Sequence, residues 1–215
     1  MSVKMIIFDL DGTLLDTSPG ILESVRYAAD KMEYPELPLE KLLTFIGPPL
    51  TVSFMRYYHC DENEAIKLTA AYREHYREGA LLKSEPYNGI LDLCRQLKDE
   101  GLILSVATSK PQIYSEKILQ HFGFDKYISV IHGADMEWKL TKADLIRLCV
   151  GENHTSECIM VGDTEYDAKG AQEAGVPFLA VTYGFGDMDK MMSYPNIGVA
   201  DKPADILEIV RNEAR

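Results

Sequence analysis

Short apolar runs alternate with segments of helical periodicity over most of the chain. Runs rich in Ile, Val, Leu, Met and Phe predict buried strands at 5–8, 103–107, 128–132, 158–161 and 178–181. Apolar residues at helical spacing between these runs predict helices at 90–100, 111–123, 142–150 and 167–174. This alternation predicts an α/β fold, with a doubly wound parallel sheet covered by helices on both faces.

The segment that follows the first run has a different pattern. Residues 19–81 show apolar positions at helical spacing, beginning with Ile21, Leu22 and Val25, and contain no convincing strand. Four helices are expected there, near 19–32, 39–45, 51–58 and 61–79. We therefore expect a helical bundle, residues 17–83, inserted into a core formed by 1–16 and 84–215. The bundle is expected to cap the carboxyl edge of the sheet, with hinges near 16–18 and 81–85.

Composition narrows the classes of protein that fit this pattern. The 215 residues are 46% apolar, enough for one large domain or a core domain with a smaller insertion. The 22 Lys and Arg against 34 Asp and Glu give a net charge of −12, which disfavours a nucleic-acid polymer as partner. With neither a secretory leader nor an apolar run of about 20 residues, the sequence predicts a cytoplasmic protein without a membrane partner. We expect a monomer or homodimer.

The cysteines and histidines show no spacing typical of a metal site, a redox motif or a catalytic triad. The four cysteines are expected to be reduced and mostly buried: Cys60, Cys94, Cys149 and Cys158. The histidines are expected to be structural or exposed: His59, His75, His121, His132 and His154.

Asp9 and Asp11 follow the first predicted strand directly, in the stretch Phe8-Asp9-Leu10-Asp11-Gly12-Thr13. Burying two carboxylates is costly unless a cation or a proton offsets their charge. The spacing therefore suggests a hard divalent cation, and Mg2+ is favoured because its sites combine one or two carboxylates with substrate phosphate. The alternative is an ordinary strand followed by an Asp-Gly turn.

Thr108 and Ser109 lie where a predicted strand gives way to a helix that Pro111 would open. Ligands in parallel sheets bind beyond the carboxyl ends of the strands. The hydroxyl of Thr108 and the N–H groups around Ser109 would surround an anion at the helix N-terminus, or they serve as an ordinary cap.

Lys142 is expected in the first turn of its helix, because Thr141 and Asp144 resemble a capping box. A cation at that position opposes the helix dipole, so a compensating anion is expected, namely Asp9 and a bound phosphoryl group. A solvated lysine is the alternative, and Lys139 is the nearest competitor for the role.

Asp163 and Asp167 stand after a further predicted strand, in Val161-Gly162-Asp163-Thr164-Glu165-Tyr166-Asp167. Asp163 is the best remaining candidate for a metal ligand. Asp167 is expected either to support the site or to stabilise a helix start.

Taken in order, the four stretches resemble the four motifs of the haloacid dehalogenase superfamily of phosphotransferases, most of all its phosphoglycolate phosphatase branch. The resemblance covers essentially the whole chain and implies a Rossmann-like core with an inserted helical cap, Mg2+ as cofactor and an aspartyl-phosphate intermediate. It gives catalytic roles to Asp9 as nucleophile, Asp11 as general acid and base, Thr108 and Lys142. The metal ligands it implies are Asp9, Asp11 through its backbone carbonyl, and Asp163, with Asp167 in support. Substrate binding is expected from Gly12, Thr13, Gly47, Ser109 and Lys110.

The expected function is hydrolysis of a small soluble phosphate ester, by resemblance 2-phosphoglycolate. A nucleoside 5'-monophosphatase is the alternative, because aromatic residues in the bundle could stack on a base. A catalytically silent binding protein on the same fold is the alternative from another class. Substrate choice is expected to depend on the turn 44–50, with Arg56, Tyr72, Arg73 and Arg77 as further candidates.

Overall fold

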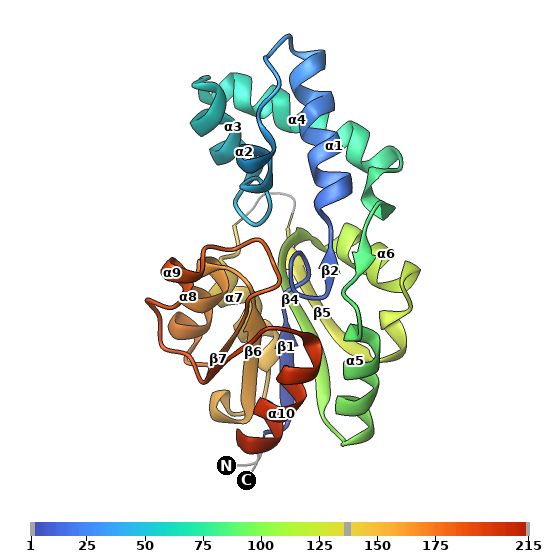
Figure 1. The fold of residues 1–215 in the computed structure, drawn as a ribbon, viewed down its shortest axis with the longest axis vertical. Coiled ribbons are helices and arrows are strands. Elements are labelled where there is room, and N and C mark those ends of the chain that lie inside the picture. Colours follow the sequence, from blue (N-terminus) through green and yellow to red (C-terminus); the bar gives the residue numbers. More distant parts are fainter. Residues whose placement is uncertain (1–2, 136–138, 214–215) are drawn as a thin grey trace. The chain divides into compact units, whose positions relative to one another are not determined.

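A computed structural model describes residues 3–135 and 139–213. The chain divides into two compact units, one formed by Met1–Leu15 with Pro86–Arg215 and the other by Asp16–Glu85. Figure 1 shows the sheet and its helices in the first unit and a group of helices in the second.

The first unit is built on a six-stranded sheet in the order β5-β4-β1-β6-β7-β8, and every strand pair in it is parallel. Its strands are β1 (Met5–Phe8), β4 (Ile103–Pro111), β5 (Ile128–Ala134), β6 (Cys158–Gly162), β7 (Phe178–Val181) and β8 (Gly198–Ala200). All four residues of β1 are buried, as expected for a central strand that is covered on both faces. The predicted α/β fold with a parallel sheet is confirmed.

Helices cover the sheet on two faces (Figure 1). The helices of this unit are α5 (Ile90–Asp99), α6 (Gln112–His121), α7 (Lys142–Val150), α8 (Glu165–Ala174), α9 (Met188–Met191) and α10 (Pro203–Glu213), with single turns η2 (Phe124–Lys126) and η3 (Thr155–Glu157). Met5 and Ile7 of β1 share one buried cluster with Leu145 of α7 and Ala168 of α8. Because side chains alternate along a strand, Ile6 and Phe8 face the other side, where α5 and α10 lie.

The predicted junction between β4 and α6 is wrong. Strand β4 continues to Pro111 instead of ending at 107, so Thr108, Ser109 and Lys110 belong to the strand. Pro111 is the residue before α6 and has an extended backbone, with ψ 138°, so it does not open the helix. Five elements were not predicted from the sequence: β8, α9, α10 and the short strands β2 (Leu15–Asp16) and β3 (Glu85–Pro86).

The second unit is helical. It contains α1 (Ser18–Lys31), α2 (Leu39–Leu43), α3 (Leu50–Tyr58), α4 (Glu62–Glu78) and the single turn η1 (Ala80–Leu82), which correspond to the predicted helices. The rings of Tyr72 and Tyr76 stack with centroids 5.3 Å apart, and both side chains are buried within the unit. These two tyrosines are therefore core residues of the bundle.

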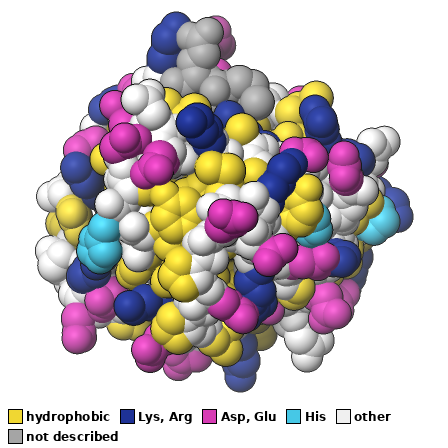
Figure 2. All heavy atoms as spheres, turned by 90° about the horizontal axis from the view of Figure 1, so that it is seen from above, with side chains coloured by type: hydrophobic (Ala, Val, Ile, Leu, Met, Phe, Trp, Pro, Cys, Tyr) yellow, Lys and Arg dark blue, Asp and Glu magenta, His cyan; other side chains and the backbone are white. Residues whose placement is uncertain are grey.

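Charges of both signs are interspersed on the face shown in Figure 2, where lysines and arginines lie among aspartates and glutamates. Within residues 3–135 and 139–213, no helix is both long enough and apolar enough to cross a membrane. Cys94, Cys149 and Cys158 are buried and Cys60 is half-buried, all with free thiols.

Candidate active site

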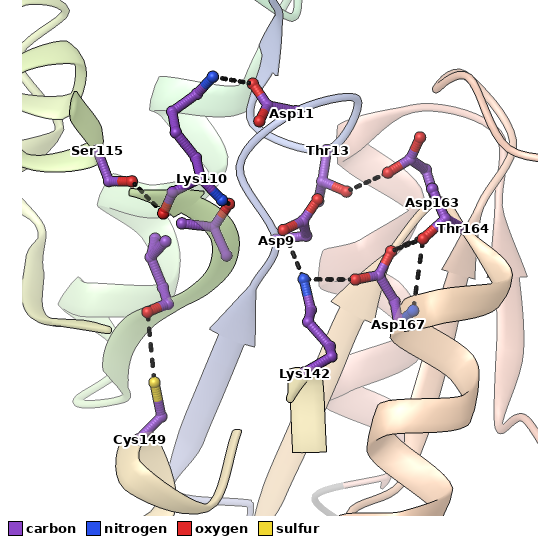
Figure 3. A network of polar contacts seen from close by, with 12 residues as sticks. Asp9, Asp11, Thr13, Lys110, Ser115, Lys142, Cys149, Asp163, Thr164 and Asp167 are labelled. Atoms are coloured by element: carbon purple, nitrogen blue, oxygen red, sulfur yellow. Dashed lines mark hydrogen bonds and ion pairs between the residues drawn. The ribbon is translucent and has the colours of Figure 1, made fainter. Parts of the chain in front are cut away.

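Asp9 and Asp163 are brought side by side by the pairing of β1 with β6. Phe8 and Val161 are register partners in this pair, and the N–H of Asp9 donates to the carbonyl of Val161 at 2.9 Å. Each carboxylate follows its strand at the carboxyl end, and both are buried. Sequence positions separated by more than 150 residues therefore meet at one edge of the sheet (Figure 3).

Lys142 joins this pair from the first turn of α7. Its Nζ lies 2.6 Å from Oδ1 of Asp9 and 2.6 Å from Oδ1 of Asp167, and its side chain is only 8% exposed. Thr141 and Asp144 form the predicted capping box, which fixes the start of the helix and the direction of the lysine. The expected contact between Lys142 and Asp9 is thus present, whereas Lys139 is exposed.

The two carboxylate oxygens of Asp167 contact different groups. Its Oδ2 accepts from the N–H of Thr164 at 2.9 Å and from the Thr164 hydroxyl at 2.7 Å, which closes a capping box at the start of α8. Its Oδ1 is the oxygen that pairs with Lys142. Helix capping and a contact within the site, which were alternatives from the sequence, therefore occur together.

Asp163 is held by groups from two distant segments. The hydroxyl of Thr13 donates to its Oδ1 at 3.2 Å, and the N–H of Phe185 donates to its Oδ2 at 2.8 Å. A Cβ atom on Gly184 would lie 2.2 Å from Oδ2 of Asp163, and one on Gly186 would lie 1.8 Å from its carbonyl oxygen. The segment 183–186 can approach Asp163 so closely only because it carries glycines at these positions.

This contact was not predicted from the sequence. Gly184 and Gly186 do not serve a left-handed turn, because neither has a positive φ in the structure. The signal available was the pair of glycines just beyond the last predicted strand, since residues after a strand's carboxyl end lie at the candidate site. Gly12 does have a positive φ, at 84°, and it also packs against the Asp163 carboxylate.

Carboxylate oxygens of Asp9, Asp163 and Asp167 lie within 4.8 Å of one another, and all three residues are buried. Burial raises the pKa of Asp9 to about 7 even though Lys142 lowers it. Burial and the charge of Asp167 likewise raise the pKa of Asp163. A single lysine leaves this group with excess negative charge, so its oxygen donors fit a hard divalent cation.

Asp11 lies outside that group and pairs with a different lysine. Nζ of Lys110 is 3.1 Å from Oδ1 of Asp11, and the two side chains are 5% and 13% exposed. The N–H of Lys110 donates to the hydroxyl of the buried Thr108 at 3.1 Å. The end of β4 thus supplies a second buried ammonium group, beside the carboxylate expected to act as acid and base (Figure 3).

The remaining predicted substrate contacts are not tested by this geometry. The N–H of Gly12 donates to the carbonyl of Leu15 at 2.9 Å, and the N–H of Thr13 donates to that of Leu10 at 3.4 Å. Phosphate binding by these N–H groups stays a prediction. It would require each N–H to break its hydrogen bond to the backbone carbonyl, or to donate to the carbonyl and the phosphate at once. Gly47 lies in the turn between α2 and α3 with φ 103°, and its contact with a substrate also stays a prediction.

Comparison with known proteins identifies the family. Residues 6–181 match the haloacid dehalogenase-like hydrolases. The chain belongs to this family. It is 40% identical to a 5'-nucleotidase from Pseudomonas aeruginosa, over 88% of this chain and 87% of that protein. It is 29% identical to a phosphoglycolate phosphatase from Mesorhizobium japonicum, over 87% and 86%. A predicted phosphatase from Clostridium acetobutylicum has the same fold, with TM-score 0.89 and 37% identity over 99% of this chain and 98% of that one.

Proposed function

We propose that the chain is a Mg2+-dependent phosphomonoesterase that hydrolyses a small soluble phosphate ester. Membership of the hydrolase family and relatives with phosphatase and nucleotidase names support phosphoester hydrolysis as the reaction class. The observation that carries the proposal is the buried Asp9 carboxylate, 2.6 Å from Lys142 and grouped with Asp163 and Asp167.

Asp9 is the proposed nucleophile. Its carboxylate attacks phosphorus, the bond between phosphorus and the ester oxygen breaks, and an aspartyl-phosphate forms on Asp9. Asp11 gives its proton to the departing alkoxide and then takes a proton from the water that attacks the aspartyl-phosphate. This second attack releases inorganic phosphate and restores both carboxyl groups.

Lys142 and the residues around it are proposed to stabilise the charge of the phosphoryl group. The ammonium of Lys142 is already directed at Asp9, so it needs little rearrangement to contact phosphoryl oxygens. Thr108, Ser109 and Lys110 are proposed to bind the same group from the end of β4. Asp9, Asp163 and the backbone carbonyl of Asp11 are the proposed Mg2+ ligands, and bound Mg2+ would supply charge neutralisation to the phosphoryl group.

Hydrolysis of a chromogenic aryl phosphate, with Mg2+ or with a chelator, tests the class of reaction. We expect turnover with Mg2+, loss of turnover with the chelator, and no turnover by Asp9→Asn under either condition. Asp11→Asn should still form the aspartyl-phosphate but release it slowly, which mass spectrometry of the intact protein would detect. Clean protein that binds phosphate esters yet shows no metal-dependent turnover would instead favour the silent binding protein.

The substrate is proposed to be either a two-carbon acid phosphate or a nucleoside 5'-monophosphate. The phosphoglycolate phosphatase relative supports the first, and the 5'-nucleotidase relative, at 40% identity, supports the second. A panel containing 2-phosphoglycolate, several nucleoside 5'-monophosphates and simple alkyl phosphates decides between them by kcat/KM. Phosphoglycolate no better than the alkyl phosphates would reject the first substrate and leave the reaction class intact.

A further inference from the structure

A pocket lies in the core unit between α5 and α10, and none of the residues in the acidic group lines it. Its volume is about 600 Å³, within the range typical of small-molecule sites. Leu93 of α5 and Leu207 of α10 line its sides, while Tyr87 and Tyr183 contribute aromatic rings. Nothing in the proposed reaction uses this pocket.

The two tyrosines form a tilted aromatic pair. Their ring centroids are 4.7 Å apart with an interplanar angle of 59°. Apolar and aromatic walls of this kind favour a ligand with a flat apolar body.

The charges at the rim favour a cation. Asp92, Asp201 and Glu208 line the pocket together with Lys202 and Arg211. Both basic residues are already engaged, Arg211 with Glu100 at 3.0 Å and Lys202 with Asp205 at 3.8 Å. Glu208 forms no close hydrogen bond or ion pair among the described residues, and its charge acts on Arg211 only at longer range. An incoming ammonium group could therefore make the first close ion pair with this carboxylate, while Arg211 keeps its contact with Glu100.

The pocket is connected to the candidate active site through Tyr183. The hydroxyl of Tyr183 donates to the carbonyl of Thr13 at 3.1 Å, and the Thr13 hydroxyl donates to Asp163. Two residues after Tyr183, the N–H of Phe185 donates to the other oxygen of Asp163. A displacement of Tyr183 would thus affect Asp163, the candidate metal ligand, in two ways: through the hydrogen bonds of Thr13 and through the backbone at Phe185.

We propose that this pocket binds a small aromatic cation and that its occupancy is transmitted through Tyr183 to Thr13 and Asp163. The aromatic body would pack on Tyr87 and Tyr183, with its ammonium group directed to Glu208. Both parts of the proposal concern the protein without bound metal or substrate. They stand independently of the proposed phosphatase activity.

Calorimetric titration with three indole compounds tests the binding. Tryptamine carries an ammonium group, tryptophol replaces it with a hydroxyl, and indole-3-acetate carries a carboxylate. We expect saturable binding of tryptamine, at least tenfold weaker binding of tryptophol, and no binding of indole-3-acetate. Glu208→Lys should weaken tryptamine at least tenfold, whereas Glu213→Lys, on the same helix but outside the pocket, should leave it unchanged. Equal binding of tryptamine and tryptophol, equal effects of the two variants, or no saturable binding at all would overturn the proposal.

Amide chemical shifts of the metal-free, 215-residue chain test the transmission. In wild type, tryptamine should shift the amides of Leu93 and Leu207 and also those of Thr13 and Phe185. In Tyr183→Phe, which loses only the donating hydroxyl, the first pair should still shift and the Thr13 shift should be lost. A wild-type protein whose Thr13 and Phe185 amides do not respond would overturn the transmission, and binding would be judged by the titration alone.

Discussion

The ammonium of Lys142 lies between two buried carboxylates, those of Asp9 and Asp167. Its protonation state therefore depends on the balance between burial and these two charges. Burial lowers the pKa of Lys142, but the charges of Asp167 and Asp9 outweigh burial and raise it above its usual range. The lysine therefore stays charged in the folded protein. Removing it would leave two carboxylates facing each other without a cation.

Lys142→Met is expected to lower both stability and activity. Breaking a buried ion pair by removing one partner costs about 3–5 kcal/mol, and we expect a loss in this range in urea denaturation of the metal-free protein. Turnover should fall to background, since the phosphoryl group loses its nearest ammonium. Lys139→Met is the control, because Lys139 is exposed, and it should change neither quantity. Matching urea midpoints for the two variants would show that Lys142 is not part of a buried pair.

Asp167 and Asp144 allow capping to be separated from support of the lysine. Each is the third residue of its helix and closes the same Thr-x-x-Asp capping box, but only Asp167 also pairs with Lys142. Asp144→Asn should leave stability and kcat/KM nearly unchanged. Asp167→Asn should cost roughly 2 kcal/mol in urea denaturation and should lower kcat/KM at least tenfold. If the two substitutions were equivalent in both measurements, Asp167 would have no role beyond the helix start.

At the scale of elements, the segment after β7 is as important to the site as the strands themselves. Gly184 and Gly186 allow the backbone to pass against Asp163 at distances that leave no room for a side chain. The N–H of Phe185 then donates directly to the carboxylate. The position of Asp163 consequently depends on a segment that carries no acidic or basic residue of its own between 183 and 186.

Gly184→Ala is expected to disturb this position without unfolding the protein. The new Cβ would lie 2.2 Å from Oδ2 of Asp163, so the carboxylate or the segment must move. We expect the increase in melting temperature produced by Mg2+ to shrink to less than half, and kcat/KM to fall at least tenfold. Gly79→Ala is the matched control, because nothing lies within 4 Å of the added Cβ. A full response to Mg2+ in Gly184→Ala would contradict the idea that this contact positions Asp163.

The elements that the sequence predicted well are those with long or uninterrupted patterns. Strand β1 is a run of four buried apolar residues, as parallel strands covered on both faces require, and it was predicted with its bounds. Strand β8 has only three residues, one of them exposed, and gives no such signal. Helix α10 was missed although Pro203 stands at its start and Ile206, Leu207 and Val210 follow at helical spacing.

In the candidate site, the residues could be predicted from the sequence, but their pairing could not. Its charged residues stand at strand ends or helix starts, where the sequence pattern indicates both their type and their place. Which lysine pairs with which carboxylate depends on the order of strands in the sheet, and no local pattern records that order. The pairing of Lys110 with Asp11 and the contact of Phe185 with Asp163 therefore became visible only in the folded chain.

For the whole molecule, the buried acids make stability depend on pH. Burial raises the pKa of Asp9 from 3.8 to about 7, and burial together with Asp167 raises that of Asp163. Between about pH 4 and pH 7 the folded chain therefore binds more protons than the unfolded chain. Stability without divalent cations should be greatest near the lower end of this window and should fall as pH rises through it.

Urea denaturation in chelator at pH 5, 6, 7 and 8 measures this dependence, and we expect a decrease on the order of 1–3 kcal/mol across the series. Asp163→Asn removes one of the titrating groups and should flatten the decrease. Added Mg2+ should stabilise the protein more at pH 8 than at pH 5, because metal and protons compete for the same oxygens. Stability that rises with pH in chelator would contradict the assigned directions.

The boundary between the two units is expected to contain the hinges of the molecule. The chain crosses between units at 15/16 and again at 85/86, next to the predicted hinge segments 16–18 and 81–85. Lys83 is the only Lys or Arg in the second segment, and its side chain is half exposed, so trypsin can report on that joint. If substrate binding closes the cap over the core, Mg2+ with orthovanadate, a phosphate mimic, should slow cleavage after Lys83 several-fold.

Cleavage after Lys98, at the exposed end of α5 in the core unit, is the internal control and should proceed at one rate with and without the ligands. Lys83→Gln removes the reporting site and identifies its fragment. Slowing at Lys83 alone would locate the change at the joint, because general stabilisation of the protein would slow both cleavages together. Unchanged cleavage at Lys83, under conditions where vanadate inhibits turnover, would place any hinge elsewhere and leave the catalytic proposal standing.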